Sequence, residues 1–332
     1  MEYIFPKRLI PGKSTIGLIA PSGVVVRHEL EAGLKILKDW GFSVRLGKNV
    51  IAKSQDYSAG SEDQRSRDLI AMMTAPDVDA IGCIVGGFAA SGIIKVLDDS
   101  TFEAIRKSPK IFFGFSDFSQ ILNALFSKGF ASLHAPNLSG LYNRSLDSLK
   151  CLKLSLLGDL PAEIGPMFGW ETVQQGFVKG RLLVSNLESL IHVLGTPFDP
   201  LNAGDEPIVL AVEEVGENKS TIARWLDTLL NHVNAKRIQG IVLGRFTKIG
   251  EKDYPAWGLE FSVERIFQKA FGAIKVPIAS LPVFGHIEEQ KGLLKRKGRE
   301  RTDFLSLPTG VRVMYKVKPE SCRLTFLEKG IE

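Results

Sequence analysis

Short apolar segments alternate with amphipathic helical patterns through the first half of the chain, and this alternation limits the possible folds. Residues 15–20 (TIGLIA) form the first apolar segment, and Leu30, Leu34 and Leu37 then recur at helical spacing. A second apolar segment, residues 42–46 (FSVRL), follows. Strands that alternate with helices in this way pair in parallel and are covered by the helices. The pattern therefore predicts an α/β fold built on a parallel sheet.

Two later apolar segments extend the same pattern. Residues 79–85 (DAIGCIV) run into Gly86 and Gly87, and residues 111–113 (IFF) run into Gly114. In open parallel sheets, ligands gather at the carboxyl ends of the strands. We therefore expect three turns to share one edge of the sheet: APSG at 20–23, VGGF at 85–88 and GFSD at 114–117.

The length and composition favour two domains, because 332 residues of which 44% are hydrophobic can bury two cores. The periodicity weakens between about residues 139 and 176, where proline and glycine recur. We predict a flavodoxin-like domain over residues 1–160, a linker over 161–176 and a smaller α/β domain over 177–332. The second domain is expected to contain strands at 177–184, 208–214, 238–245, 277–284, 311–315 and 323–327, with helices from residue 186 and over about 221–234.

Charge and cysteine content exclude several classes of protein. The formal net charge is +5 and the pI is near 9.0, and most of the excess lies between Lys291 and Arg301. Such a local excess does not indicate a nucleic-acid binder. The chain shows neither a signal-peptide pattern nor an apolar run that could span a membrane, so we expect a cytoplasmic protein. Cys83, Cys151 and Cys322 are odd in number and far apart, which predicts buried thiols rather than disulfides.

Ser116 stands where the apolar strand ends and a helical pattern begins. Ile121, Leu122 and Leu125 mark that helix. A hydroxyl at such an elbow can act as a nucleophile, because the first amides of the helix point at the same place. Serine also caps helices by hydrogen bonding alone, and this local pattern does not separate the two interpretations.

A nucleophilic serine needs a base, and usually a third group that holds the base. His286 is the best candidate among the five histidines, because it follows the apolar segment PVFG and Gly285 leaves room for a close approach. The other four are interpreted as structural or solvated: His28 at the start of a helix, His134 in an apolar segment, and His192 and His232 within helices.

Glu213 is the candidate for the third group. It ends the strand 208–213 (IVLAVE), and a strand this apolar is normally buried on both faces, so its carboxylate needs a partner. The alternative is that Glu213 only begins the acidic loop EEVGE. If Glu213 orients His286, the chain order is serine, acid, histidine, as in α/β-hydrolases, although their G-x-S-x-G elbow is absent.

A set of motifs follows in order along the chain: IGLIAPSG, GGFAASGIIKVLDD, IFFGFSDFSQILNAL, LHAPNLS, SNLESLIHVLGTPF, LAVEEVGE and LPVFGH. Together they resemble the LD-carboxypeptidase family of serine peptidases, whose relatives include the microcin C self-immunity hydrolases. The resemblance is colinear from about residue 13 to residue 315. It implies a triad in which Ser116 is the nucleophile, His286 the base and Glu213 the acid. It also implies a flavodoxin-like N-terminal domain and a smaller C-terminal α/β domain, with the triad assembled across the cleft.

The resemblance further implies that backbone amides of Asp117 and Gly87 hold the oxyanion, because glycines allow close approach and a helix N-terminus stabilises negative charge. Gly86 and Phe88 of the same turn are expected to contact the substrate. Many family members carry an arginine where this chain has Val85. Members are commonly dimers and need no metal, so we expect a homodimer without a cofactor; no histidine pair or cysteine cluster here has metal-ligand spacing.

The segment after His286 is longer than is usual in the family and holds the basic residues between Lys291 and Arg301. A charge run of this kind is usually a solvated loop. The alternative is a flap beside the histidine that attracts an anionic peptide or nucleotide.

The sequence therefore predicts a cytoplasmic serine carboxypeptidase of peptidoglycan recycling, which would release D-Ala from muropeptide tetrapeptides. An alternative within the same family is hydrolysis of aminoacyl-nucleotide adducts such as microcin C. An alternative of another class is a non-catalytic two-domain protein that only binds its ligand.

Overall fold

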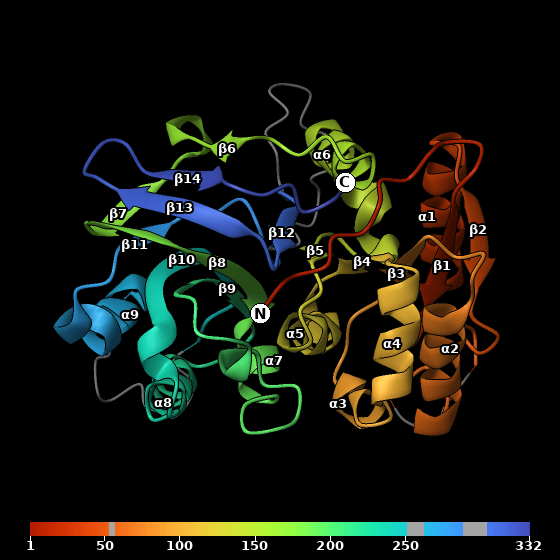
Figure 1. Ribbon diagram of the computed structural model, residues 1–332, viewed down its shortest axis with the longest axis horizontal. Helices are drawn as coiled ribbons and strands as arrows, with labels where there is room; N and C mark the ends of the chain where they lie inside the picture. The colour runs from red at the N-terminus through yellow and green to blue at the C-terminus, as the bar shows by residue number, and fades with distance from the viewer. Residues whose placement is uncertain (53–56, 251–261, 288–303) are drawn as a thin grey trace.

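The computed structural model describes residues 1–52, 57–250, 262–287 and 304–332. These residues form two β-sheets with helices packed against them, and helix α5 (Ser119–Ser127) lies between the sheets (Figure 1). The prediction of a mixed α/β fold with a parallel N-terminal sheet is confirmed.

The first sheet has the strand order β12-β5-β4-β3-β1-β2. Strands β1 to β5 are parallel and take the order 2-1-3-4-5 of flavodoxin-like sheets. Strand β12 is antiparallel to its neighbour β5. The strands are β1 (Thr15–Ile19), β2 (Ser43–Leu46), β3 (Ala80–Cys83), β4 (Ile111–Gly114), β5 (Ser132–His134) and β12 (Leu307–Thr309).

Helices cover both faces of the first sheet, which explains why its central strands are apolar throughout. Successive side chains of a strand point to opposite faces, so Leu18 packs in one cluster and Ile19 in the other. One face is covered by α1 (Arg27–Asp39) and α6 (Leu146–Leu156). The other is covered by α2 (Glu62–Thr74), α3 (Ala90–Ile94), α4 (Asp99–Lys107) and α5.

Side-chain caps fix the starts of several helices. Ser61 and Gln64 form a reciprocal capping box at α2, and Asp98 accepts a hydrogen bond from the amide of Thr101 at α4. Such caps satisfy backbone N–H groups that have no partner within the helix. The turns before these helices are therefore defined by local sequence.

The second sheet has the strand order β6-β14-β13-β8-β9-β10-β11-β7, with β8 to β11 parallel and the outer strands antiparallel. This sheet has eight strands and the first has six; residues 161–176, which we predicted to be a linker, contribute β6 and β7. The strands are β6 (Glu163–Ile164), β7 (Glu171–Gln174), β8 (Gly176–Asn186), β9 (Ile208–Val215), β10 (Ile238–Thr247), β11 (Ile278–Ser280), β13 (Arg312–Val317) and β14 (Arg323–Phe326).

Three helices pack on one face of the second sheet: α7 (Leu187–Ile191), α8 (Lys219–Leu230) and α9 (Val263–Phe271). Leu183 of β8 and Leu210 of β9 face this side, whereas Leu182 and Val209 belong to the cluster on the opposite side. The alternation again buries both faces of the strands.

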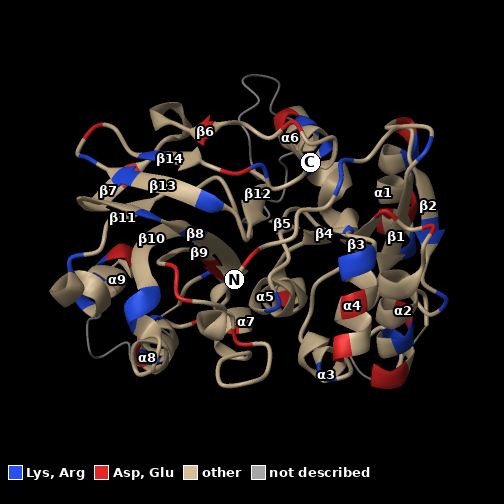
Figure 2. Ribbon diagram, viewed as in Figure 1, with Lys and Arg blue, Asp and Glu red and all other residues tan. Residues whose placement is uncertain are grey.

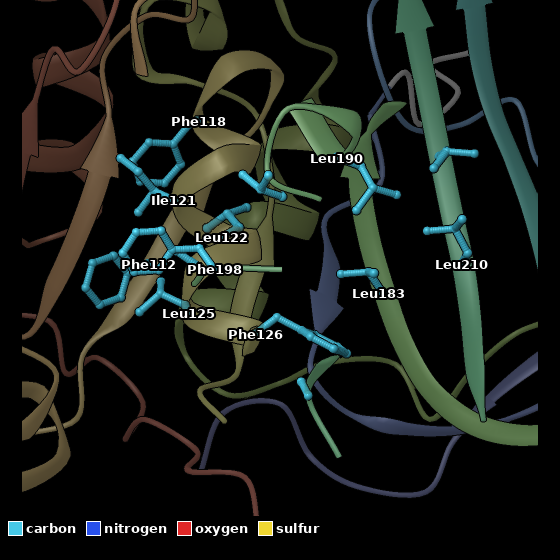
Figure 3. Close-up of a cluster of buried hydrophobic side chains, with 14 of the residues drawn as sticks. Phe112, Phe118, Ile121, Leu122, Leu125, Phe126, Leu183, Leu190, Phe198 and Leu210 are labelled. Carbon is cyan, nitrogen blue, oxygen red and sulfur yellow. The ribbon is translucent and has the colours of Figure 1, made fainter. Parts of the chain in front are cut away.

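Helix α5 joins the two sheets through one continuous apolar core. Leu122 and Phe126 lie in the same cluster as Phe112 of β4, Leu183 of β8 and Leu210 of β9 (Figure 3). Every residue from 119 to 126 is buried. The helix that follows Ser116 is therefore fixed against both sheets.

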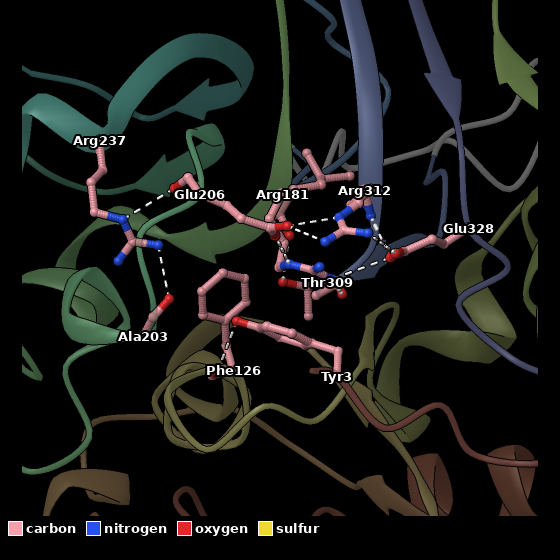
Figure 4. A network of polar contacts seen from close by, with 11 residues as sticks. Tyr3, Phe126, Arg181, Ala203, Glu206, Arg237, Thr309, Arg312 and Glu328 are labelled. Carbon is pink, nitrogen blue, oxygen red and sulfur yellow. Dashed lines mark hydrogen bonds and ion pairs between the residues drawn. The ribbon is translucent and has the colours of Figure 1, made fainter. Parts of the chain in front are cut away.

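A polar network ties the start of the chain to the second sheet (Figure 4). The hydroxyl of Tyr3 donates to the carbonyl of Phe126 at 3.0 Å, and the guanidinium of Arg181 lies 3.9 Å from the centre of the Tyr3 ring. Arg181 in turn pairs with Glu206 at 2.7 Å and with Glu328 at 3.2 Å. The N-terminal segment thus adds a second connection between α5 and the second sheet.

None of the helices among the described residues is both long and apolar enough to cross a membrane. In α4 the acidic residues Asp99 and Glu103 precede the basic residues Arg106 and Lys107, so the two charges lie toward opposite ends of the helix (Figure 2).

The shared core predicts a large cost for shortening Leu122, which is fully buried in α5. Leu122→Ala should lower the free energy of unfolding by about 2–5 kcal/mol, because it removes buried methyl groups and leaves a cavity. Leu146→Ala is the matched control, since Leu146 is 64% exposed and its loss should cost less than about 0.5 kcal/mol. Urea denaturation of both variants would measure the difference, and equal midpoints would contradict this account of the core.

Candidate active site

Ser116 lies at a sharp turn between β4 and the short 3₁₀ helix Ser116–Phe118, which leads into α5. Phe115 is extended, with φ −154°, and Ser116 then takes φ +64°, in the left-handed region. A non-glycine residue in that region costs about 1–3 kcal/mol and persists only where the surrounding structure holds it. Ser116 therefore stands at the tip of a strained strand-to-helix elbow.

The Ser116 hydroxyl contacts an imidazole rather than the helix. Its Oγ lies 3.1 Å from Nε2 of His286. Both the 3₁₀ helix and α5 begin without a side-chain cap. Capping therefore does not explain why a serine occupies this position.

His286 lies between Ser116 and Glu213. Its Nδ1 is 2.6 Å from Oε2 of Glu213, and the same oxygen accepts a 3.0 Å hydrogen bond from the backbone amide of His286. Glu213 is completely buried, whereas 19% of the His286 side chain is exposed. Because a carboxylate can only accept, Nδ1 donates to Glu213 and Nε2 is left to accept from the serine hydroxyl.

Gly285 permits this close approach. Its φ is +96°, and a Cβ atom at this position would lie 2.5 Å from Cβ of Glu213. Any other residue would therefore push the loop that carries His286 away from the carboxylate.

The charges of His286 and Glu213 stabilise each other. Burial disfavours the imidazolium, but the charge and hydrogen bond of Glu213 outweigh it and raise the pKa of His286 above the ordinary 6.5. Burial likewise opposes the charged form of Glu213, yet His286 lowers the pKa of that carboxyl below its ordinary 4.5. Glu213 is therefore a carboxylate at neutral pH and keeps Nδ1 as the donor.

The side chain of Asp117 joins the elbow to the neighbouring turns. Its Oδ2 accepts hydrogen bonds from the hydroxyl of Ser22 and from the amide of Ala90, the latter at 2.9 Å. Its Oδ1 accepts from Nε2 of Gln120 at 2.6 Å. We expected only the backbone amide of Asp117 to matter, and nothing in the local sequence pattern revealed that its carboxylate connects the turns.

The Gly-Gly turn packs directly against Ser116. The amide of Gly23 donates to the carbonyl of Gly86 at 2.8 Å, so the turns at 20–23 and 85–88 are hydrogen-bonded. A Cβ atom at Gly86 would lie 2.9 Å from Oγ of Ser116, and one at Gly87 would lie 2.7 Å from the amide nitrogen of Gly23. The three turns lie together at one edge of the first sheet.

A pocket of about 190 Å³ lies beside Ser116 and His286. Asn137 on its wall was missed by sequence analysis, although the motif LHAPNLS contains it. Its Oδ1 accepts from the amide of Phe115 at 3.0 Å, which holds the residue before the serine. The pocket is lined by Gly86, Gly87, Phe115, Ser116, Asn137, Ser139, Gly140, Arg144 and His286.

Phe88 does not belong to the pocket lining, although it follows Gly87. Its side chain is 77% exposed, and its ring centre lies 6.4 Å from that of Tyr57. Val85, by contrast, packs against the core of the first sheet and brings no charge to the site.

His134 is completely buried between Phe115, Phe284 and Phe304, with ring centres 5.8–5.9 Å from its own. Burial lowers the pKa of His134 to about 4, so this ring is neutral at physiological pH. Its position agrees with the structural role that the sequence predicts.

The remaining histidines lie away from Ser116. His28 is exposed in the first turn of α1, and His192 caps the end of α7. His232 is not within a helix as predicted: α8 ends at Leu230, and Nε2 of His232 instead lies 2.8 Å from Asp199.

The cysteines are free thiols, with Cys83 and Cys322 buried and Cys151 half-buried. In the part of the chain that the structure describes, no three His, Cys, Asp or Glu side chains gather as a metal site would require. The basic residues from Lys291 to Arg301, a solvated loop or a flap by the sequence, lie outside the described residues.

Comparison with known proteins identifies the family. Residues 16–135 match the LD-carboxypeptidase N-terminal domain, and residues 179–295 match the LD-carboxypeptidase C-terminal domain. The murein tetrapeptide carboxypeptidase of Pseudomonas aeruginosa is 32% identical over 83% of this chain and 89% of its own length. The chain belongs to the LD-carboxypeptidase family.

Other members of the LD-carboxypeptidase family agree in sequence and fold. The microcin C7 self-immunity protein of Escherichia coli is 26% identical over 73% of this chain and 79% of its own length. The crystal structure of muramoyltetrapeptide carboxypeptidase from Oxalobacter formigenes superposes with a TM-score of 0.75 at 25% identity and covers 95% of this chain and 99% of that one. The prediction of family membership is confirmed.

The opposite effects of Glu213 on His286 and of burial on His134 predict how these two imidazoles titrate. In an NMR titration toward lower pH, His286 should take up its proton with a midpoint above pH 6.5. His134 should stay neutral down to about pH 4. Glu213→Gln removes the main interaction that opposes burial at His286, so the pKa of its imidazole should fall. Glu163→Gln, in a distant ion pair with Arg323, should leave that pKa unchanged. The same midpoint in Glu213→Gln as in the parent would contradict the electrostatic coupling.

Proposed function

We propose that this protein is a serine-type carboxypeptidase that releases the terminal D-Ala from muropeptide tetrapeptides. The proposal rests on two consecutive hydrogen bonds, one between Ser116 and His286 and one between His286 and the buried Glu213. This arrangement of alcohol, imidazole and carboxylate is how unrelated hydrolases activate serine. The relatives named as murein tetrapeptide and muramoyltetrapeptide carboxypeptidases support the choice of substrate.

In the proposed reaction, Oγ of Ser116 attacks the carbonyl carbon of the amide next to the terminal residue. Nε2 of His286 takes the hydroxyl proton and passes it to the leaving amine, while Glu213 holds the imidazole and stabilises its positive charge. Cleavage of the C–N bond leaves an acyl-serine. Water, deprotonated by the same imidazole, then hydrolyses this ester and restores Ser116.

The amides of Asp117 and Gly87 hold the negative oxygen that develops on the attacked carbonyl. Asp117 is the second residue of the 3₁₀ helix at the elbow, and Gly87 lines the pocket. Backbone amides fixed before the reaction stabilise such an oxygen without reorganisation. Fixing them is the role we assign to the Asp117 carboxylate and to the hydrogen bond between Gly23 and Gly86.

Gly86 and Phe88 contact the substrate in this proposal. Gly86 lies against Ser116 and lets a peptide backbone pass the nucleophile closely. The exposed ring of Phe88 next to Tyr57 offers an apolar surface outside the pocket lining for the part of the peptide that does not react. The proposal further includes a cytoplasmic homodimer that acts on small peptides without a cofactor.

A second candidate substrate is an aminoacyl-nucleotide adduct of the microcin C type. The similarity to the microcin C7 self-immunity protein favours it, although the identity of 26% is lower than that to the murein carboxypeptidase. Purified protein assayed in parallel on a muropeptide tetrapeptide and on an aminoacyl sulfamoyl adenylate would separate the two. Turnover of the adenylate alone would replace the first candidate by the second.

The third candidate is a protein that binds its ligand without chemistry. A fluorophosphonate probe separates it from both hydrolases, because the probe forms a bond only with an activated serine. Labelling of Ser116, located by peptide mass spectrometry, is the expected result. Ligand binding without labelling would favour the non-catalytic function.

Ser116→Ala should reduce release of D-Ala by at least about 10³-fold, because removal of a nucleophile abolishes the covalent pathway. Ser127→Ala is the matched control, since Ser127 ends α5, the helix that follows the elbow, and its hydroxyl bonds only to the carbonyl of Ala124 among the described contacts. Mass spectrometry of the products measures both variants. Activity of Ser116→Ala at the parental level on every substrate that the parent accepts would refute the assignment of the nucleophile.

A further inference from the structure

Arg144 brings a permanent positive charge to the pocket that contains Ser116. Among the described residues that line this pocket, Arg144 and His286 are the side chains that can be cationic. An arginine is always charged at physiological pH, whereas the imidazole must be neutral to accept the serine proton. Arg144 is therefore the described residue of this wall best suited to bind an anionic group of a substrate.

The position of Arg144 is held by its surroundings. It follows the 3₁₀ helix Leu138–Asn143, and its amide donates to the carbonyl of Leu141 at 3.1 Å. The guanidinium carbon lies 5.1 Å from the ring centre of Phe304, a fully buried aromatic residue. Stacking on an aromatic ring orients the planar guanidinium.

The guanidinium also lies against the pocket wall. A Cβ atom on Gly140 would be 3.6 Å from one of its terminal nitrogens, so the guanidinium lies beside this glycine of the pocket wall. Arg144 has further interactions in the molecule. Because a guanidinium has five N–H donors, it can keep other partners and still bind a carboxylate.

The charge of Arg144 reaches the imidazole of His286. It opposes protonation of that ring, against the stronger effect of Glu213. In the proposed reaction the leaving amine takes its proton from this imidazole, so the leaving residue must lie next to His286. The amine and the carboxylate of that residue share one Cα atom, through bonds of about 1.5 Å each, so the terminal carboxylate must lie close to the same pocket.

We propose that Arg144 binds the free carboxylate of the residue that leaves, and that this contact makes the enzyme selective for peptides with an unblocked C-terminus. The inference rests on the proposed carboxypeptidase function. Val85, which precedes the Gly-Gly turn, is apolar and packs against the core of the first sheet, so it cannot provide this contact. Arg144 supplies the charge from a different part of the chain.

Binding to catalytically inactive protein tests the inference directly. The ligands are a muropeptide tetrapeptide that ends in D-Ala and the same peptide with a C-terminal amide. By calorimetry, Ser116→Ala should bind the free acid about 10- to 100-fold more tightly than the amide, the range expected for hydrogen bonds to a charged group. Adding Arg144→Gln should remove this preference. Adding Arg144→Lys should keep part of it, because lysine keeps the charge but cannot bind the carboxylate in a bidentate geometry.

Arg106→Gln is the matched control. The guanidinium carbon of Arg106 also lies 5.1 Å from a phenylalanine ring, that of Phe130, but Arg106 is on α4, outside the pocket. In the Ser116→Ala background it should leave the preference for the free acid unchanged. In otherwise active protein, Arg144→Gln should raise KM for the free acid, because the substrate loses the charge that binds its carboxylate.

The outcomes distinguish this inference from the proposed function. A preference for the free acid that survives Arg144→Gln, or binding of neither peptide, overturns the role of Arg144 even if the parent is an active peptidase. A preference that depends on Arg144 in a chain that hydrolyses neither peptide overturns the carboxypeptidase function and leaves the carboxylate site standing.

Discussion

The burial of α5 between two sheets is the constraint on which the site depends. The helix follows Ser116 directly, and its apolar side chains pack on β4 of one sheet and on β8 and β9 of the other. Polar contacts reinforce the packing: Nδ2 of Asn123 donates to Ser185 at 3.0 Å, and the hydroxyl of Ser189 donates to the carbonyl of Ser116 at 3.2 Å. Because Glu213 lies in β9, one rigid core sets the position of the hydroxyl relative to the carboxylate.

The strain of the elbow fits this arrangement. A left-handed serine is unfavourable by itself, so neighbouring groups must hold it. Asp117 binds the adjacent turns, Asn137 holds Phe115, and Gly86 leaves space for the side chain of Ser116. These contacts come from segments far apart in the sequence, and they keep the hydroxyl directed at His286 before any substrate arrives. Catalytic groups positioned in advance need little reorganisation during the reaction.

Sequence periodicity was sufficient for β1 to β4 of the first sheet, since these strands are local patterns with clear ends, but not for β5, which has three residues. The residue types and strand ends also singled out Ser116, Glu213 and His286, which the fold brings together. Strand β6 could not be predicted, because two residues show no periodicity. The pairing of β12 with the first sheet and the carboxylate contacts of Asp117 arise only from long-range packing, for which a single sequence gives no signal.

Strand β12 crosses from the second half of the chain to the first. It pairs with β5 through Leu307 opposite His134 and Thr309 opposite Ser132, so the C-terminal half completes the N-terminal sheet. A chain that ended at residue 160 would lack β12, so β5 would become an edge strand. Its unpaired backbone N–H and C=O groups could then pair with other chains. The N-terminal half therefore depends on the C-terminal half for one strand of its sheet. A homologous N-terminal half transferred to another protein would need a new strand to pair with β5.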